Sequence, residues 1–441
     1  MTTQIHTEAI NPANGESLGT IPQNTVPDIV DAVQRIRLAQ KKWSQLSFSE
    51  RGKYLRKMQR HLIEHGEEYA RTVSNDNGKT LADAYLTDIS SSVIAFDYYI
   101  KHSSRVLRPR RVRGSHIFGL FTRNRLQHVP MGVIGIISPW NYPLAIPIHE
   151  ILMGLMAGNG ILYKAASETQ MVGQVIQKII DAGELPKDLF IQVNVPGRVA
   201  GDAFLEAGID KLFFTGSVPI GKVLMAKAAE TLTPVSLELG GNDPMIVCAD
   251  ANLKKAANGA IWAGFSNSGQ SCAGVERVYV HRDVYKPFMK LLNKRVENLR
   301  VGDPQIDENH IGTMTTSRQQ DAVRSALKQA IDQGAVVSAM SQINEDTDQA
   351  LPATVLTDVN HQMAIMREET FGPVLGIMPF RTIKEAIELA NDSDLGLTAS
   401  VWTKNHREGR RIASELETGV VTINDHLITH GMPNLPWGGF K

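Results

Sequence analysis

The sequence predicts an α/β protein with a doubly wound parallel sheet, a second α/β unit after it, and a β-strand arm between helical and sheet regions. Residues 132–214 alternate continuous apolar runs with helical segments, which is typical of buried parallel strands joined by crossover helices. Strand-like runs resume at 374–378 and 419–423, which indicates the second unit. Before residue 132 the apolar residues recur mostly at helical spacing.

Size and composition limit the class of protein. A chain of 441 residues predicts two or three domains, because a single core stops growing well below that length. Lys+Arg and Asp+Glu number 46 each, so no net charge favours nucleic acid or an anionic membrane. The two cysteines, Cys248 and Cys272, cannot form a disulfide framework and indicate a reducing compartment. No signal pattern opens the chain, and we expect a cytoplasmic protein.

The first hundred residues predict a hairpin followed by helices. Turn residues such as Asn11-Pro12 and Asn14-Gly15 divide residues 1–24 into two short strands. Residues 26–74 carry apolar side chains at three- and four-residue steps, and 80–102 continues the helical pattern.

A metal-binding pattern, His-x-x-Glu-His, lies within this helical region at residues 61–65. Two histidines four residues apart share a helix face and could hold zinc as in an inverted zinc peptidase. A third ligand is needed, and the polar side of an amphipathic helix explains the same residues. The peptidase remains a remote alternative.

The arm is predicted from an exposed apolar strand. Five arginines gather around Pro109 within residues 105–113, but no aromatic residues alternate with them, so a solvated linker is favoured over a nucleic-acid or lipid contact. The segment from His116 to His128 then predicts an exposed strand or hairpin. Such an edge commonly pairs with a neighbouring subunit, so we expect an arm at 114–129 and a homodimer or homotetramer.

The doubly wound sheet is predicted element by element. Its expected order is strand 133–137, helix 147–157, strand 160–164, helix 169–182, strand 190–193, helix 201–207 and strand 211–214. The turn after the last strand contains Gly216, Ser217 and Gly221 and opens a helix at 222–231. Glycines allow a close approach of the backbone, and the free N–H groups of a helix start favour phosphate.

A candidate nucleophile lies in the loop at 265–274. It follows an expected helix at 253–264, precedes an expected strand at 277–280, and places Cys272 between two glycines. A thiol on a tight loop can have backbone N–H groups directed past its sulfur, and cysteine is a strong nucleophile once ionised. The alternative is a buried inert thiol, which is our interpretation of Cys248.

Five stretches taken together closely resemble the aldehyde dehydrogenase family over nearly the whole chain. They are Pro139-Trp140-Asn141-Tyr142-Pro143, Phe214-Thr215-Gly216-Ser217, Leu237-Glu238-Leu239-Gly240-Gly241-Asn242, Gly269-Gln270-Ser271-Cys272 and Glu369-Thr370-Phe371-Gly372-Pro373. The resemblance implies a Rossmann-like cofactor domain at 1–113 and 130–238, the arm at 114–129, and a catalytic domain at 239–436.

The resemblance also implies the chemistry. Cys272 would attack the aldehyde to give a thiohemiacetal, because hydride cannot leave a planar carbonyl carbon. The side-chain amide of Asn141 and the backbone N–H of Cys272 would stabilise the alkoxide. Hydride transfer leaves a thioester, and Glu238 would activate the water that hydrolyses it. Its position between Leu237 and Leu239 is expected to raise its pKa.

NAD or NADP is the implied cofactor. The positions that resemble the family's cofactor-binding residues are Trp140, Lys164, Ser167, Gly216, Ser217, Gly221, Glu369 and Phe371. Many NAD-preferring members have a glutamate three residues after the lysine, where this chain has Ser167 and then Glu168. We therefore expect both cofactors to bind.

Two further expectations concern the end of the chain and the substrate. Family members normally continue for several tens of residues beyond 437–441, so a shortened, weakly active or non-catalytic member that binds cofactor is an alternative. Semialdehyde-specific members often carry an arginine in the stretch equivalent to 146–150, which here has none. With Tyr142, Trp262 and Phe265 as candidates to line an apolar tunnel, we expect an uncharged medium-chain or aromatic aldehyde.

Overall fold

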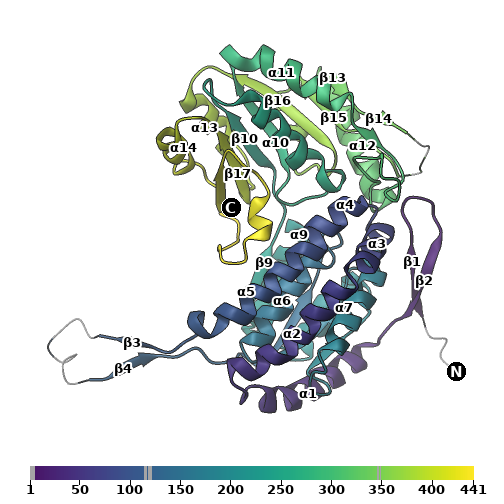
Figure 1. The fold of residues 1–441 in the computed structure, drawn as a ribbon, viewed down its shortest axis with the longest axis vertical. Helices are drawn as coiled ribbons and strands as arrows, with labels where there is room; N and C mark the ends of the chain where they lie inside the picture. The colour runs from purple at the N-terminus through teal and green to yellow at the C-terminus, as the bar shows by residue number, and fades with distance from the viewer. Residues whose placement is uncertain (1–4, 114–116, 118–121, 345–346, 348) are drawn as a thin grey trace.

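The computed structural model describes residues 5–113, 117, 122–344, 347 and 349–441. Two sheet-centred lobes lie one above the other in Figure 1, and a thin hairpin projects from the lower lobe. The chain begins with β1 (His6–Ile10) and β2 (Ser17–Pro22), which pair antiparallel as expected from the turn residues between them.

Helices occupy residues 26–106, in agreement with the apolar spacing. Their bounds are α1 (Val26–Trp43), α2 (Phe48–Glu64), α3 (Gly66–Asn77), α4 (Leu81–Asp83), the π-helical turn η1 (Ala84–Ser90) and α5 (Ser91–Val106). Thr25 and Ser47 begin α1 and α2 with capping boxes. Gly78, at φ 90°, ends α3 in the left-handed conformation that glycine adopts without strain.

The lower lobe contains a five-stranded parallel sheet in the order β7-β6-β5-β8-β9. The strands are β5 (Val133–Ile137), β6 (Gly160–Lys164), β7 (Phe190–Gln192), β8 (Lys211–Thr215) and β9 (Val235–Glu238). The crossover helices are α6 (Ala145–Met156), α7 (Gln170–Ala182), α8 (Gly197–Glu206) and α9 (Val218–Thr231), with a 3-10 turn, η3 (Ser167–Thr169), before α7. The predicted doubly wound topology is confirmed.

Helix starts are where the sequence reading was least accurate. Helix α9 begins four residues earlier than predicted, because Pro219 fits in the first turn of a helix, where its missing N–H is not needed. Helices α6 and α8 also begin earlier, at Ala145 and Gly197.

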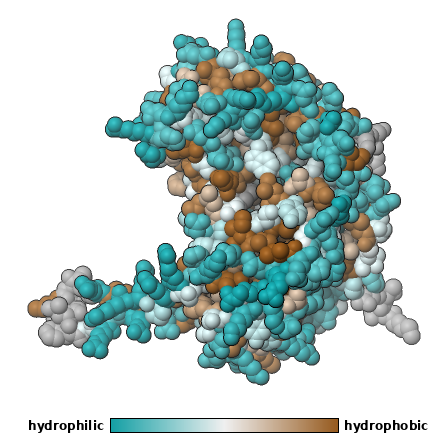
Figure 2. Space-filling view, viewed as in Figure 1, coloured by the Kyte–Doolittle hydropathy of each residue, from teal (hydrophilic) through white to brown (hydrophobic). Residues whose placement is uncertain are grey.

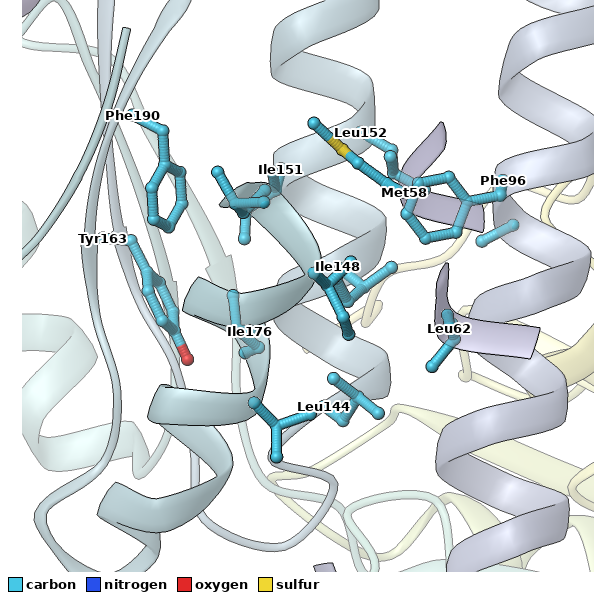
Figure 3. Close-up of a cluster of buried hydrophobic side chains, with 14 of the residues drawn as sticks. Met58, Leu62, Phe96, Leu144, Ile148, Ile151, Leu152, Tyr163, Ile176 and Phe190 are labelled. Atoms are coloured by element: carbon cyan, nitrogen blue, oxygen red, sulfur yellow. The ribbon is translucent and has the colours of Figure 1, made fainter. Parts of the chain in front are cut away.

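The lower core joins the early helices to the sheet. Figure 3 shows Met58 of α2 and Phe96 of α5 beside Ile148 and Ile151 of α6, with Tyr163 of β6 on the far side. All five side chains are fully buried. The first helices therefore belong to the same folded unit as the parallel sheet.

The upper lobe contains a seven-stranded sheet in the order β13-β15-β16-β11-β10-β17-β18, parallel except at β13. Its strands are β10 (Asp243–Val247), β11 (Val275–His281), β13 (Val336–Met340), β15 (Thr354–Thr357), β16 (Val374–Phe380), β17 (Thr398–Trp402) and β18 (Val420–Ile423). Its helices are α10 (Leu253–Phe265), α11 (Arg282–Val296), α12 (Ser317–Asp332), α13 (Ile383–Asn391) and α14 (His406–Ala413).

The described residues of this lobe also form a second short sheet and several 3-10 turns. β12 (Arg300–Val301) pairs with β14 (Gln342–Ile343), and the turns are η4 (Ser266–Gly269), η5 (Ala364–Met366) and η6 (Ile428–Gly431).

The projecting hairpin is formed by β3 (Arg110–Val112) and β4 (Asn124–Leu126), which pair antiparallel (Figure 1). The predicted arm at 114–129 therefore begins too late, since its first strand lies in the arginine-rich stretch. Residues 114–116 and 118–121 of the predicted arm lie outside the described residues. In the described part of the chain, no helix combines the length and apolarity that crossing a bilayer requires.

Candidate active site

The site lies at the carboxyl edge of the five-stranded sheet. Strands β5 and β8 are neighbours, yet the chain leaves β5 toward β6 and leaves β8 toward β9 on the other side. Parallel sheets bind ligands where the strand order reverses in this way. The loop with Asn141 follows β5, Gly216 follows β8, and Glu238 ends β9.

The loop before Cys272 turns sharply through its own backbone. Asn267 and Ser268 have φ values of 53° and 56°, and Gly269 has 70°. A Cβ on Gly269 would come within 2.2 Å of the carbonyl oxygen of Gly372. The predicted tight loop is confirmed, and glycine is required there by both conformation and space.

Asn141 lies against this loop. Its side-chain Nδ2 donates to the carbonyl of Gln270 at 3.1 Å, and its own carbonyl accepts from Nδ2 of Asn267 at 2.8 Å. Asn141 is buried, and a side-chain amide has two N–H groups, so one can serve a substrate oxygen while the other holds the loop. The predicted oxyanion donor, Asn141, is therefore hydrogen-bonded to the loop that leads to Cys272.

The thiol of Cys272 is surrounded by carboxyl groups. Burial raises its pKa above the ordinary thiol range, and the charges of Glu369, Asp243 and Glu238 raise it further. The thiol is therefore protonated at neutral pH in the free enzyme. Attack on a carbonyl requires a base to remove that proton.

Glu238 has the acidity of such a base. Burial raises its pKa to about 7, and a hydrogen bond from the side chain of Trp437 opposes the shift. Its Oε2 is buried and has no hydrogen-bond partner among the described residues. Orphaned buried oxygens are usually satisfied by water or ligand, so a water can occupy this position. The sequence reading predicted the raised pKa and missed the contact with Trp437.

A second carboxyl, Glu150, lies near Glu238 and was not predicted. It is on α6, and burial followed by the charge of Glu238 raises its pKa to about 8. Burial and the charge of Glu238 therefore both favour the neutral form of Glu150. The sequence showed only that residues 146–150 lack an arginine.

The turn between β8 and α9 fits a cofactor's phosphates. Ser217 stands at the N-cap without a side-chain capping bond, so it does not occupy the N–H groups of the first turn. A Cβ on Gly221 would come within 2.6 Å of the end of the Leu239 side chain, so glycine lets α9 pack closely against the residue after β9. The residues present fit a dinucleotide.

Lys164 ends β6, and Ser167 follows it at the same edge. The Lys164 ammonium is buried and donates to the carbonyl of Ala165 at 3.0 Å, and burial lowers its pKa. Ser167 begins a 3-10 turn and is half-buried, whereas Glu168 is exposed. The nearest carboxylate in the sequence, that of Glu168, is therefore exposed one residue beyond the position where NAD-preferring members have a glutamate.

Three further predicted cofactor residues are Glu369, Phe371 and Trp140. Oε1 of Glu369 accepts from the backbone N–H of Gly241 at 3.0 Å, and burial raises the pKa of Glu369 to about 8. The rings of Trp140 and Phe371 stand edge to face with centroids 5.3 Å apart. Phe371 has φ 51°, held by N–H bonds from residues 370 and 371 to the buried carboxylate of Glu276.

The predicted substrate tunnel is only partly formed by the expected residues. Trp262 and Phe265 line a cavity of about 670 Å³, and Tyr142, Asn141 and Cys272 are not among its lining residues. Tyr142 is instead buried beneath the ammonium of Lys79. The cavity is therefore separate from the nucleophile. Figure 2 shows apolar side chains gathered where the two lobes meet, which offers another approach for an apolar substrate.

His61 of α2 and His65, which follows that helix, do not form a metal site. His61 Nε2 is 2.7 Å from the hydroxyl of Tyr69, and His65 Nδ1 is 3.0 Å from the carbonyl of His61. Within the described ranges, no group of three or more His, Cys, Asp or Glu side chains could hold a metal ion. The zinc-peptidase alternative is wrong.

Comparison with known proteins gives one family. The model of the aldehyde dehydrogenase family matches residues 2–441. The 4,4'-diapolycopene aldehyde oxidase of a Methylomonas species is 38% identical over 434 residues, which are 98% of this chain and 81% of that protein. A putative NADP(+) succinate-semialdehyde dehydrogenase of Mycolicibacterium smegmatis is 34% identical and covers 97% and 82%. The structure of an aldehyde dehydrogenase from Bacillus cereus with NAD+ aligns with a TM-score of 0.92 at 34% identity, covering 99% and 88%.

Proposed function

The chain belongs to the aldehyde dehydrogenase family, whose members oxidise aldehydes with NAD or NADP, and we propose how its residues divide that reaction. One observation carries the proposal. The loop that leads to Cys272 is hydrogen-bonded to Asn141, and the thiol lies within the field of Glu238. The proposal therefore combines a nucleophile, an oxyanion donor and a base.

In the first step the sulfur of Cys272 bonds to the carbonyl carbon and its proton passes to Glu238. The carbonyl oxygen becomes an alkoxide, which the free N–H of the Asn141 amide and the backbone N–H of Cys272 stabilise. When bound, the nicotinamide supplies the acceptor for the hydride. The product on the protein is a thioester of Cys272.

In the second step Glu238, after releasing the proton of Cys272 to solvent, removes a proton from water. The hydroxide attacks the thioester carbon, the carbon–sulfur bond breaks and the carboxylic acid leaves, while the thiolate of Cys272 takes up the proton from Glu238 and is restored as a thiol. A pKa of about 7 suits this role, because the carboxylate is available near neutral pH and still takes up a proton.

The cofactor is proposed to lie across residues 1–113 and 130–238, and the catalytic residues 239–436 close over it. Support comes from the turn at Gly216, Ser217 and Gly221 and from Lys164, which all stand at the carboxyl edge of the sheet. Trp140, Phe371 and Glu369 face the nicotinamide half. Ser167 places no carboxylate at the adenosine ribose, so NAD and NADP both fit.

The substrate is proposed to be an uncharged aldehyde. Helix α6 presents Glu150 near Glu238 where a semialdehyde-specific member would offer an arginine, and like charges repel. The Methylomonas relative is named for 4,4'-diapolycopene aldehyde, while the M. smegmatis relative is named for succinate semialdehyde, so the two names differ on this point.

We expect a homodimer or homotetramer in the cytoplasm. The hairpin β3–β4 projects with all six strand residues exposed. Helix α9 also exposes apolar side chains, namely Ile220, Val223 and Met225. Exposed apolar faces and sheet edges of this kind commonly contact a second copy. Light scattering during gel filtration measures the mass, and a monomer would contradict the expectation.

The activity assay follows formation of the reduced cofactor over a panel of aldehydes, with NAD and NADP compared at equal concentration. We expect hexanal and benzaldehyde to exceed succinate semialdehyde in kcat/KM. A hundredfold preference for NAD would contradict the dual cofactor. A protein that binds cofactor and oxidises none of the aldehydes would instead support the non-catalytic alternative.

A further inference from the structure

A fully buried ion pair lies behind the loop that carries Asn141. Lys79 follows α3, Asp88 lies in the π-helical turn η1, and Nζ of Lys79 is 2.7 Å from Oδ2 of Asp88. Both side chains are 0% exposed. Removing two charges from water costs several kcal/mol for each ion, so such a pair is a weak source of stability and needs other bonds in compensation.

The lysine directs its remaining donors to the Asn141 loop. Nζ of Lys79 donates to the carbonyl of Asn141 at 2.8 Å and lies 4.4 Å from the ring centroid of Tyr142. The preceding carbonyl, that of Trp140, accepts from Nδ2 of Asn77 at 2.9 Å. Three consecutive residues of the loop are thus held by side chains from the end of α3.

The aspartate holds the other end of the same loop. Oδ1 of Asp88 accepts from the backbone N–H groups of Leu144 and Ala145, both at 3.1 Å. These are orphan donors at the start of α6, where a carboxylate is favoured by the helix dipole. One carboxylate therefore links the lysine under Asn141 to the helix that begins four residues later.

The neighbouring aspartate reaches the nucleophile loop. Oδ1 of Asp83 accepts from the hydroxyl of Ser266 at 3.1 Å, and Oδ2 accepts from the backbone N–H of Asn267 at 2.9 Å. Asn267 in turn donates to the carbonyl of Asn141, which Lys79 also binds. One short segment, residues 77–88, thus binds both loops that meet in the active site.

We propose that Lys79 and Asp88 are positioning residues that fix the side-chain amide of Asn141 for the developing alkoxide. The proposal rests on the role proposed above for Asn141. An oxyanion donor is effective only when it is preorganised, and catalytic groups must be held to within about 0.5 Å. The π-helical turn supports this reading, because such turns are frequent at functional sites and here one carries Asp88.

A purely structural role predicts a different outcome, and the chain offers a matched control. Arg51 is also a buried cation that donates to main-chain carbonyls, those of Leu46 and Met156. Met156 is the last residue of α6, the helix whose start Asp88 holds. Arg51→Met therefore removes a comparable buried bond at the end of α6 away from Asn141.

The first experiment compares Lys79→Met with Arg51→Met in the full chain. We expect Lys79→Met to lower kcat by about 10- to 100-fold, since a displacement of about 1 Å can cost that much, with the KM for the cofactor within about twofold. Arg51→Met should lower the melting temperature and keep kcat within about twofold. Equal kcat for both variants and the parent protein would overturn the proposal.

The second experiment is a double-mutant cycle with Asn141→Ala. If Lys79 acts through Asn141, the double variant should be no slower than Asn141→Ala alone, within about twofold, because residues that act as a unit are not additive. Independent, multiplying losses would overturn the positioning role. If Asn141→Ala kept the full kcat, the role of Asn141 as oxyanion donor would be wrong. That result differs from independent losses in the cycle, which would contradict only the role of Lys79.

A third variant covers the case in which Lys79→Met does not fold, since it leaves a buried carboxylate unpaired. Lys79→Met with Asp88→Leu replaces both charges by apolar groups, which is often neutral or stabilising. A folded and slow double replacement is the expected result. A folded double replacement with the kcat of the parent protein would overturn the proposal.

Discussion

The two loops that meet in the active site are shaped in different ways. The loop before Cys272 turns through three consecutive residues with positive φ, two of which are Ser268 and Gly269, so its form is largely a property of its own backbone. The loop around Asn141 has no residue with positive φ and is held by side chains from residues 77–88. The first loop is shaped mainly by its own backbone, with Asp83 bound near its start, whereas the second is shaped by side chains from residues 77–88.

The largest expected effect contrasts the two cysteines. Burial raises the pKa of Cys248 to about 12 and that of Cys272 further, so acidity alone does not distinguish them. Only Cys272 stands on the shaped loop. We expect Cys272→Ser to reduce kcat at least about 1,000-fold, because the hydroxyl is a much poorer nucleophile near neutral pH. Cys248→Ser should change kcat less than about twofold in the same steady-state assay.

Glu238→Gln should impair both chemical steps. Loss of a general base costs about 100- to 10,000-fold, so steady-state turnover should fall steeply. A rapid-mixing experiment follows the first step, and no burst of reduced cofactor is expected because Glu238 also takes the proton of Cys272. A burst would show that another group accepts that proton and that Glu238 serves only the second step.

The carboxyl group of Glu238 should also determine how kcat depends on pH. Glu238 must be ionised to act as a base, and its raised pKa of about 7 means that kcat should increase as pH rises through 7 and level off above it. The pH profile of kcat at saturating substrate measures this limb. A profile that is already flat at pH 5.5 would show that the base has an ordinary carboxyl pKa.

Substitution of Gly269 should disturb the backbone conformation of the loop before Cys272. Gly269→Ala places a Cβ within 2.2 Å of a carbonyl oxygen in a left-handed conformation, so we expect a loss of about 2–4 kcal/mol in the free energy of unfolding. Gly197→Ala is the control, because nothing lies within 4 Å of that Cβ. Chemical denaturation measures the free energy of unfolding of both variants. Equal losses for Gly269→Ala and Gly197→Ala would contradict the requirement for glycine at position 269.

The smallest effect concerns Glu150. Its pKa of about 8 means that it is neutral at pH 6 and charged at about pH 9. Glu150→Gln should raise kcat/KM for succinate semialdehyde relative to hexanal by roughly two- to fivefold at about pH 9 and little at pH 6, because only the ionised carboxylate repels the substrate. An unchanged ratio at both pH values would show that α6 does not contact the substrate.

The sequence predicted those parts of the molecule whose form depends on neighbouring residues. The doubly wound strands, the hairpin before Thr25 and the tight loop at Gly269 all follow from local patterns of apolar, turn and glycine residues. The raised pKa of Glu238 was also predictable from its flanking leucines. Helix starts and the onset of the arm were displaced by a few residues, because capping and pairing depend on contacts that spacing does not record.

By itself, then, the sequence determined the alternation of strands and helices and the identity of the reactive groups. Only the tertiary structure decided that Lys79 and Asp88 lie beneath Asn141, that Trp437 contacts Glu238, and that Tyr142 is buried away from the Trp262 cavity. The reason is physical. Backbone conformation is set largely by adjacent residues, whereas the partner of a buried charge is whatever the folded chain brings within hydrogen-bond distance.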